Sequence, residues 1–391
     1  MGTGNCGIFA GTCPPLYRVP VPFGTCPPLC GACPPFVLTA GGPLDIIGPD
    51  VEGITGIPAM NILITGANGF IGCNLCRHFL GRGHRVYAFV RPTSDLRFLE
   101  GLGVEIITGD LADASSIAIP DDVEAVVHAA AIVSDMARDE ECDRNIYQAT
   151  VNLVRRLQEK RPPVRRFVYV STALVLGLEG TGISEERPGR NIRHLPYTKH
   201  KIRAERFVLA EQRERAFPAV ILRPGDVYGP YDRTTCAQIL RGCERGVPLI
   251  VGSGRRRFAY CWVGNLCQAA ELALEKPGVE GRAYTVTNGV VPTWREFFTA
   301  LQAGLGRRQR VYVPVWFAFT LAALTQAAAK VVPGLKPSLS HYRIRRITTE
   351  TTFDISRTVA ELGYEPDDDY RSQAAEIVRW YLEEKERGRL A

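Results

Sequence analysis

The first 59 residues contain almost no charged side chains. Only four of them are charged, so the basic stretch that opens a secretory signal peptide is missing, and no continuous apolar run follows. Instead, the segment holds eleven prolines, eleven glycines and five of the twelve cysteines. Such a composition cannot bury enough apolar surface to offset the entropy lost on ordering. Residues 1–59 are therefore predicted to be a disordered extension, and we hypothesise that it is not native and that the natural start is Met60.

The sequence beyond residue 60 also lacks cysteines at paired spacing and basic residues interleaved with aromatic ones. The cysteines beyond residue 60 have no paired spacing, which argues against a disulfide framework. The stretch CPPLCGAC, residues 26–33, is followed by no second ligand pair at finger-like spacing, so no metal site is predicted. Residues 60–391 carry a net charge of +8, but no basic patch is interleaved with aromatic residues. Nucleic acid is therefore not an expected partner.

The chain also lacks an uninterrupted apolar run of membrane-spanning length. Its most apolar segment, residues 311–333, is interrupted by Thr320, Gln326 and Lys330 and stays short of the roughly 20 apolar residues that a bilayer requires. We expect a buried or surface helix there, with a peripheral membrane contact as a further hypothesis. The predicted location is the cytoplasm, and membrane association is the alternative.

From Met60 onward, short apolar runs alternate with longer amphipathic stretches. This alternation predicts an α/β fold with a doubly wound parallel sheet, the Rossmann arrangement, over residues 60–235. Residues 236–391 are predicted to form a smaller, mainly helical substrate-binding region. The expected strands cover residues 61–65, 85–90, 104–108, 124–130, 166–171 and 218–224, and the expected helices start near residue 70 and cover 145–159, 264–275, 293–306 and 372–387.

A glycine-rich turn joins the first predicted strand to the first predicted helix. In TGANGFIG, Gly66 suits the tight turn, Gly69 allows a pyrophosphate to approach, and Gly72 allows the helix to pack on the strand. Phe70 and Ile71 open the helix whose N-terminus would face the phosphates. The strand, turn and helix together predict a dinucleotide site.

The second predicted strand ends in Arg91, where an NAD site usually carries an acidic residue for the ribose 2′-hydroxyl. A carboxylate would repel a 2′-phosphate, whereas a guanidinium can pair with it. NADP is therefore the predicted cofactor, with NAD as the alternative. A solvent-exposed strand-end residue without such a role is the other interpretation of Arg91.

Three side chains are candidates for proton transfer. Tyr197 and Lys201 are four residues apart at the start of a helical stretch and project from one face. A tyrosine of pKa about 10 is a poor acid at neutral pH, and the Lys201 ammonium is expected to lower that pKa. Tyr197 would then exchange a proton with a substrate oxygen while hydride moves to or from a nicotinamide. Thr172, at the end of the fifth predicted strand, would hold the same oxygen.

These motifs together resemble an extended short-chain dehydrogenase/reductase, of the NAD(P)-dependent epimerase/dehydratase superfamily. TGANGFIG, GDL, HAAA, VSTALVLG, YTKHK and RPGDVYGP follow one another in the family's order from Met60 to about residue 385. The resemblance implies that Asn145 supports the proton relay, that Lys201 also binds the nicotinamide ribose, and that the protein forms a homodimer through helices. Further cofactor contacts implied by the resemblance are Asp110 and Leu111 beside the adenine, Ala129, Ala130 and Ala131 along the cofactor, and Pro224, Gly225 and Val227 beside the nicotinamide.

The branch of the family is indicated by a late motif, GSGRRRFAYCWVGNL. Phe258, Trp262 and Asn265 stand where nucleotide-sugar epimerases have other residues, and with Leu176 they are more similar to the 3β-hydroxysteroid dehydrogenase and dihydroflavonol-reductase-like branch. The prediction is an NADP(H)-preferring oxidoreductase that interconverts a secondary alcohol and a ketone on a small apolar molecule, steroid- or terpenoid-like. Two alternatives stay open: a nucleotide-sugar epimerase or dehydratase, whose diphosphate residues 255–257 could bind, and a non-catalytic NADP-sensing module.

Overall fold

The computed structural model describes residues 58–134, 136–190, 195–247, 250–308, 312–331 and 340–390. The predicted disordered extension and its cysteines lie outside the described residues, apart from residues 58 and 59. The cysteines within the described ranges, Cys73, Cys76, Cys142, Cys236, Cys243, Cys261 and Cys267, are all free and buried.

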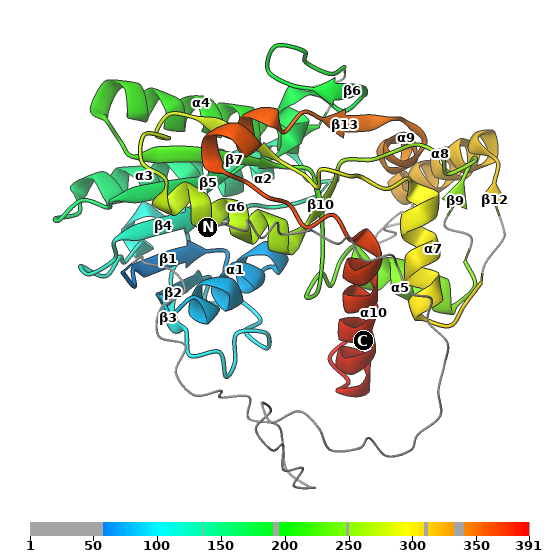
Figure 1. The fold of residues 1–391 in the computed structure, drawn as a ribbon, viewed down its shortest axis with the longest axis horizontal. Helices are drawn as coiled ribbons and strands as arrows, with labels where there is room; N and C mark the ends of the chain where they lie inside the picture. The colour runs from blue at the N-terminus through cyan, green and yellow to red at the C-terminus, as the bar shows by residue number, and fades with distance from the viewer. Residues whose placement is uncertain are drawn as a thin grey trace, which may run out of the picture. The chain divides into compact units, whose positions relative to one another are not determined.

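A seven-stranded parallel sheet forms the centre of the fold, which confirms the predicted Rossmann class (Figure 1). The strand order is β11-β7-β5-β4-β1-β2-β3, so the chain winds outward in both directions from β1. The central strands are rich in β-branched and aromatic residues and are buried on both faces, as expected for parallel strands covered by helices. The strands are β1 (Asn61–Thr65), β2 (Arg85–Val90), β3 (Glu105–Thr108), β4 (Ala125–His128), β5 (Arg166–Val170), β7 (Ala219–Pro224) and β11 (Ala283–Val286).

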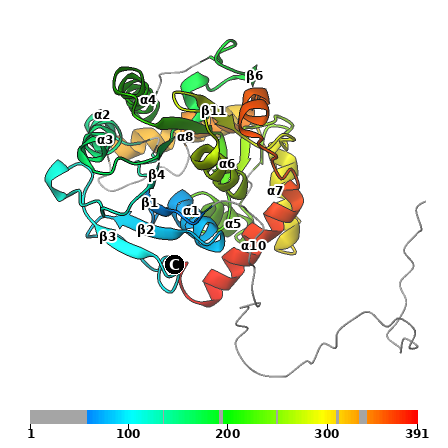
Figure 2. The same ribbon diagram turned by 60° about the vertical axis from the view of Figure 1, so that its left-hand side comes forward.

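Helices cover both faces of this sheet (Figure 2). One apolar core lies under α1 (Phe70–Gly81) and α6 (Val263–Glu275). A second core lies under α3 (Ala149–Glu159) and α4 (Pro196–Arg215), and α2 (Asp139–Cys142) contacts α4. Because each helix has one apolar face, the two cores fill the space on either side of the strands.

The C-terminal half supplies a third core rich in aromatic rings. It lies between α5 (Cys236–Glu244), α7 (Trp294–Gly304) and α10 (Tyr370–Glu386). The predicted helices at 293–306 and 372–387 are confirmed, with ends shifted by one or two residues. The edge strand β11 and helix α6 also come from beyond residue 235, so this half completes the sheet as well.

Shorter elements connect these layers. Within the described part of the chain, no helix has both the length and the apolarity to cross a bilayer. The remaining helices are α8 (Val315–Val331) and α9 (His341–Thr348), and the short helical turns are η1 (Ala114–Ser116), η2 (Asp143–Gln148), η3 (Ala173–Leu176) and η4 (Thr358–Leu362). The remaining strands form the parallel pairs β8 (Asp226–Tyr228) with β10 (Tyr260–Trp262), β9 (Ile250–Val251) with β12 (Tyr312–Val313), and β6 (Gly180–Ile183) with β13 (Thr351–Phe353).

A buried hydrogen-bonded chain ties β1, β4 and α3 together through His128. Thr150 donates to the carbonyl of Ile146 at 2.6 Å, so its oxygen accepts from His128 Nε2 at 3.1 Å. His128 Nδ1 then accepts from the Thr65 hydroxyl at 2.7 Å, and the same hydroxyl oxygen accepts the N–H of Ala130 at 3.3 Å. This pattern places the ring proton on Nε2. Burial, with the Lys201 charge second, lowers the pKa of His128 to about 3.

The lowered pKa of His128 predicts a loss of stability in acid. An unfolded histidine has a pKa of about 6.5. Below that pH, His128 binds a proton in the unfolded chain but stays neutral in the folded one. The free energy of unfolding should fall by up to about 1.4 kcal/mol per pH unit from this group between roughly pH 6 and pH 4. Urea unfolding of His128→Gln should show a correspondingly flatter dependence on pH. The exposed His341→Gln serves as the control and should keep the wild-type slope; an unchanged slope in His128→Gln would contradict the assignment.

Candidate active site

The candidate residues follow the carboxyl ends of neighbouring strands in the main sheet. The strand order reverses at β1, since β2 lies on one side of it and β4 on the other. In open parallel sheets a crevice forms at such a switch point. The residues after β1, β2, β3, β4, β5 and β7 are therefore brought to one edge, although they lie up to 160 positions apart in the chain.

The glycine turn has the geometry of a phosphate cradle. Gly66 has a φ of +66°, and a Cβ there would lie 2.8 Å from the Cα of Ala130. A Cβ on Gly72 would lie 2.1 Å from the carbonyl oxygen of Gly66, so α1 packs directly on the turn. Gly69 caps α1 without a side-chain hydrogen bond, and Phe70 and Ile71 form the first turn of the helix. The unblocked helix N-terminus and the lack of side-chain atoms fit a dinucleotide pyrophosphate.

The other predicted cofactor residues lie at the ends of the next strands. Asp110 and Leu111 follow β3, and the carbonyl of Leu111 accepts from Asn152 on α3 at 2.9 Å. Ala129, Ala130 and Ala131 follow β4 and are partly buried. Pro224 ends β7, Gly225 and Val227 continue into β8, and a Cβ on Gly225 would lie 2.3 Å from the carbonyl oxygen of Ala259.

Arg91 is exposed and directly follows β2. Its backbone N–H donates to Ser94 Oγ at 3.1 Å, and Ser94 N–H returns a bond to the Arg91 carbonyl at 3.0 Å. This local turn holds the backbone at the strand end. Within the described ranges the guanidinium has no ion pair, so it is available to an anion.

Thr172, Tyr197 and Lys201 are brought together at the end of β5. Thr172 is buried and caps η3, accepting the N–H of Leu174 at 3.3 Å, and its hydroxyl also interacts with that of Tyr197. Tyr197 and Lys201 occupy the first two turns of α4, as their spacing predicts. Lys201 is buried, and its Nζ donates to the carbonyl of Val170 at 2.8 Å.

The protonation of this group differs from the sequence expectation. Burial raises the pKa of Tyr197, and the nearby Tyr342 raises it further, while Thr172 lowers it. Burial lowers the pKa of Lys201 to about 7, against the opposing effect of the Glu205 carboxylate. The expected lowering of the tyrosine pKa by Lys201 is therefore wrong for this structure. The reason is that the ammonium is turned to the Val170 carbonyl and its own charge is penalised by burial.

Asn145 lies in the π-helical turn η2, which packs against α4. Its side-chain amide donates to the carbonyl of Glu141 at 2.9 Å, inside its own helical segment. The structure therefore places Asn145 beside α4, and among the described residues no hydrogen bond joins it directly to Tyr197 or Lys201. π-helical turns often occur at functional sites, where they reposition one side chain.

One turn after Lys201, α4 carries an ion pair that the sequence did not indicate. Glu205 follows Lys201 by one turn of α4, is buried, and accepts from Arg223 of β7 at 3.1 and 2.8 Å. Glu185 supplies a second carboxylate to the same guanidinium. The i,i+4 spacing of Lys201 and Glu205 was visible in the sequence, but the arginine partner was not.

Helix α9 also carries residues of the site that the sequence did not indicate. Arg346 is buried and donates to both carboxylate oxygens of Asp226, through Nε at 3.3 Å and Nη2 at 2.5 Å. Its remaining Nη1 is buried and has no hydrogen-bond partner among the described residues. Tyr342, one turn earlier on the same face of α9, interacts electrostatically with Tyr197 and raises its pKa. This helix therefore borders both Tyr197 and the strand beside Gly225.

Two of the residues that indicated the branch, Phe258 and Trp262, are part of the C-terminal core. Phe258 stacks on Trp294 with ring centroids 3.8 Å apart. Asn265 donates to Asn288 and to the carbonyl of Asp367, and the Trp262 N–H donates to Asn288 at 2.8 Å. Leu176 is buried in η3, and within the segment 255–257 Arg257 pairs with Glu350.

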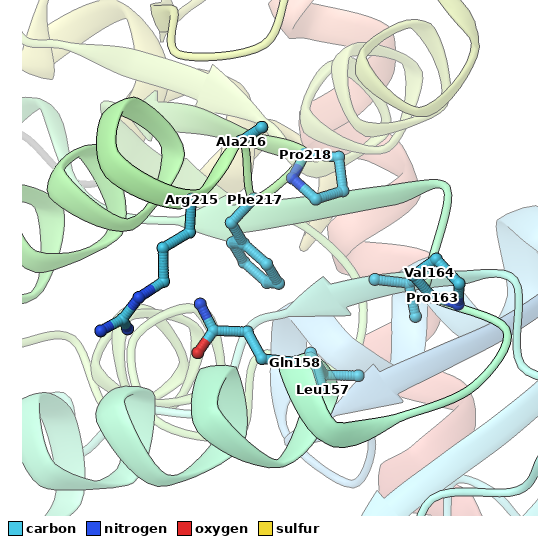
Figure 3. Close-up of a pocket in the computed structure, with 8 residues that line it drawn as sticks. All are labelled: Leu157, Gln158, Pro163, Val164, Arg215, Ala216, Phe217 and Pro218. Atoms are coloured by element: carbon cyan, nitrogen blue, oxygen red, sulfur yellow. The ribbon is translucent and has the colours of Figure 1, made fainter.

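A separate cavity of about 440 Å³ lies at the opposite edge of the sheet (Figure 3). It is formed where α3 and α4 end and where β7 begins, with Leu157 and Phe217 among its apolar walls and Arg215 beside Gln158. It therefore lies away from the carboxyl ends of the strands. Across the described ranges, no group of three or more His, Cys, Asp or Glu side chains could hold a metal ion.

Comparisons with known proteins agree with this geometry. Residues 62–287 match the NAD dependent epimerase/dehydratase family. The chain is 30% identical to Sterol demethylase protein B of Methylococcus capsulatus over 346 residues, which cover 83% of this chain and 99% of that protein. It is 29% identical to the 3 beta-hydroxysteroid dehydrogenase/Delta 5→4-isomerase of Mycobacterium tuberculosis over 341 residues, 82% of this chain and 90% of that protein.

Solved structures share the fold. The UDP-glucuronic acid 4-epimerase of Bacillus cereus matches with a TM-score of 0.66 at 20% identity, over 83% of this chain and 99% of that chain. At that identity the likeness concerns the fold alone. The sequence matches, the strand order and the Thr172, Tyr197 and Lys201 group together confirm the resemblance inferred from the motifs. The chain therefore belongs to the NAD-dependent epimerase/dehydratase family and is an NAD(P)-dependent oxidoreductase of the extended short-chain dehydrogenase/reductase type.

Proposed function

We propose that this protein is an NADP(H)-preferring oxidoreductase that interconverts a secondary alcohol and a ketone on an apolar, steroid- or terpenoid-like substrate. The observation that carries the proposal is the group formed by Thr172, Tyr197 and Lys201 at the carboxyl end of β5, the sheet edge that also carries the glycine turn. A protein that only sensed the cofactor would not need a buried lysine one helical turn after a tyrosine at that edge. The tyrosine and the cofactor cradle lie at the same edge of the sheet, as an oxidoreductase requires.

Each side chain has a role that its surroundings support. Because burial raises the pKa of Tyr197, its hydroxyl is protonated at neutral pH and can give its proton to a ketone oxygen. Thr172 would hydrogen-bond the same oxygen, and Lys201, with a pKa of about 7, can carry part of a positive charge beside it. When bound, the nicotinamide supplies or accepts the hydride. The protonated tyrosine favours reduction of a ketone as the starting step.

The proposed preference for NADP rests on Arg91. Its exposed guanidinium follows β2 at the strand end where the adenosine ribose lies in sites of this fold. No carboxylate takes that position to repel a 2′-phosphate. A charge-assisted hydrogen bond to that phosphate would favour NADP over NAD.

The proposed substrate class rests on the relatives. Two of them are named for sterol or steroid reactions, and each aligns with more than 80% of this chain. The nucleotide-sugar alternative would use an arginine cluster for the diphosphate. Here Arg257 of that cluster is already paired with Glu350 at 2.7 Å, which weakens that alternative.

Tyr197→Phe tests the proposed proton transfer. Removing the hydroxyl should lower the turnover of a ketosteroid with NADPH by about 10²- to 10⁴-fold, since the proton donor is lost. NADPH affinity, followed by fluorescence titration, should stay within about twofold, because the ring still fills its place. Tyr370→Phe at the start of α10 is the matched control. Unchanged turnover in Tyr197→Phe would remove this residue from the mechanism, and conversion of UDP-sugars without net NADPH oxidation would indicate an epimerase instead.

Arg91→Ala tests the cofactor preference. Loss of a charge-assisted contact worth about 1.5–3 kcal/mol should weaken NADPH binding by roughly 10- to 150-fold and leave NADH binding nearly unchanged. Fluorescence titration with both cofactors measures the two affinities. Arg213→Ala, which removes the same charge from an exposed position on α4, should alter neither. An equal loss of affinity for both cofactors would contradict a 2′-phosphate contact.

A further inference from the structure

Helix α8 has its large apolar side chains on the outside. Trp316 is 70% exposed and Leu324 is 64% exposed, and Val315, Phe317 and Leu321 are exposed as well. Together with the exposed Tyr312 of β12, these residues make up the set of exposed apolar side chains that we call the α8 patch. It comprises Tyr312, Val315, Trp316, Phe317, Leu321 and Leu324.

The inner side of the same helix carries small residues. Ala318 and Ala322 are buried and pack on Val251 and on Ile344 of α9. A surface helix of a globular protein normally buries its large apolar residues and exposes polar ones. In α8 the half-buried Phe319 packs on this core, whereas the tryptophan, phenylalanine and leucines of the patch are exposed, so the fold itself does not bury them. Exposed apolar surfaces of this kind are typical of sites that bind another protein or a membrane.

The segment that carries the patch is basic, although two of its arginines, Arg345 and Arg346, are paired with Glu179 and Asp226. Residues 307–349 contain eight arginines and lysines and no aspartate or glutamate. Of these, Arg308 is exposed just before the patch. Arg295 of α7 is exposed beside it, with its guanidinium 5.7 Å from the ring centre of Tyr312. An aromatic and aliphatic surface bordered by arginines matches an anionic lipid bilayer, whose headgroups attract the cations while its acyl region accepts the apolar side chains.

We propose that the α8 patch docks this protein on the surface of an anionic membrane. Helix α8 would lie in the plane of the headgroups with Trp316 and Leu324 inserted and the arginines at phosphate level. The proposal does not depend on the proposed reaction, because docking needs only the patch and its charges.

A second copy of the chain is the other occupant to consider. Two patches meeting face to face would bring the exposed Arg295 and Arg308 of both copies together. An anionic lipid surface supplies the missing negative charge. The charge pattern therefore favours the membrane.

Docking at this place would bring the membrane close to the catalytic side chains. Helix α9 packs on α8 through Ile344, and the two helices lie side by side (Figure 1). The opposite side of α9 carries Tyr342, the charge neighbour of Tyr197, and Arg346, the partner of Asp226. A single helix thus separates the membrane-facing patch from the candidate active site. An apolar substrate dissolved in the bilayer would have a short path to Tyr197.

The test is co-sedimentation of the full chain with vesicles of phosphatidylcholine alone or with phosphatidylglycerol added. We expect binding to the anionic vesicles that weakens as salt is raised. Trp316→Ser combined with Leu324→Ser should lower the partition coefficient at least about tenfold. Arg308→Gln should lower it about fivefold on anionic vesicles only. Val290→Ser, at a side chain that is 63% exposed elsewhere, is the matched control and should bind as the wild type does.

Tryptophan fluorescence supplies an independent readout. The other three tryptophans, Trp262, Trp294 and Trp380, are at most 8% exposed, so quenching by brominated lipid would report on Trp316. We expect quenching in the wild type and its loss in Trp316→Phe. The absence of vesicle binding, or equal binding by the patch variant, would overturn the proposal. Dimerisation without lipid that disappears in the patch variant would assign the surface to a second copy.

Discussion

The backbone of Gly66 lies so close to Ala130 that a single side-chain carbon at residue 66 would come within 2.8 Å of the neighbouring Cα. This close approach joins β1 to β4 at the point where the strand order reverses, and the rest of the site depends on it. The link is reinforced from inside the fold, because the Thr65 hydroxyl bonds both His128 and the N–H of Ala130. Neutral His128 is therefore part of the support for the cofactor crevice, although it is too deeply buried to meet a substrate.

The buried cationic side chains near Tyr197 have two kinds of partner, either carboxylates or a backbone carbonyl. The guanidinium of Arg223 is held by Glu205 and Glu185, and that of Arg346 is held by Asp226, so the pKa of each arginine is raised in spite of burial. Lys201 has a weaker arrangement, with a backbone carbonyl at 2.8 Å and the Glu205 charge one helical turn away. Burial therefore lowers its pKa to about 7, in spite of the opposing effect of the Glu205 carboxylate.

Helices α8 and α9 give the C-terminal half two different surfaces. One side of the pair presents large apolar residues, and the other side reaches Tyr197 and Asp226. The small residues Ala318 and Ala322 allow the two helices to pack closely. The proposals of an apolar substrate and of a membrane surface are physically compatible, since a substrate of that class partitions into the bilayer from which the site would take it.

The strands, the glycine turn and the spacing of Tyr197 and Lys201 could be predicted from the sequence alone, because these depend on local patterns. β1 and β2 lie where the apolar runs predicted them, and Tyr197 and Lys201 share the first turns of α4 because four residues make about one helical turn. Only the tertiary structure decided the protonation of Tyr197 and Lys201, because a pKa depends on burial and on neighbours from other elements. It alone brought Arg346 to Asp226 across 120 positions of chain and turned Trp316 outward. A local pattern shows that a side chain is charged or apolar, whereas its partner and its solvent are set by the way distant segments pack.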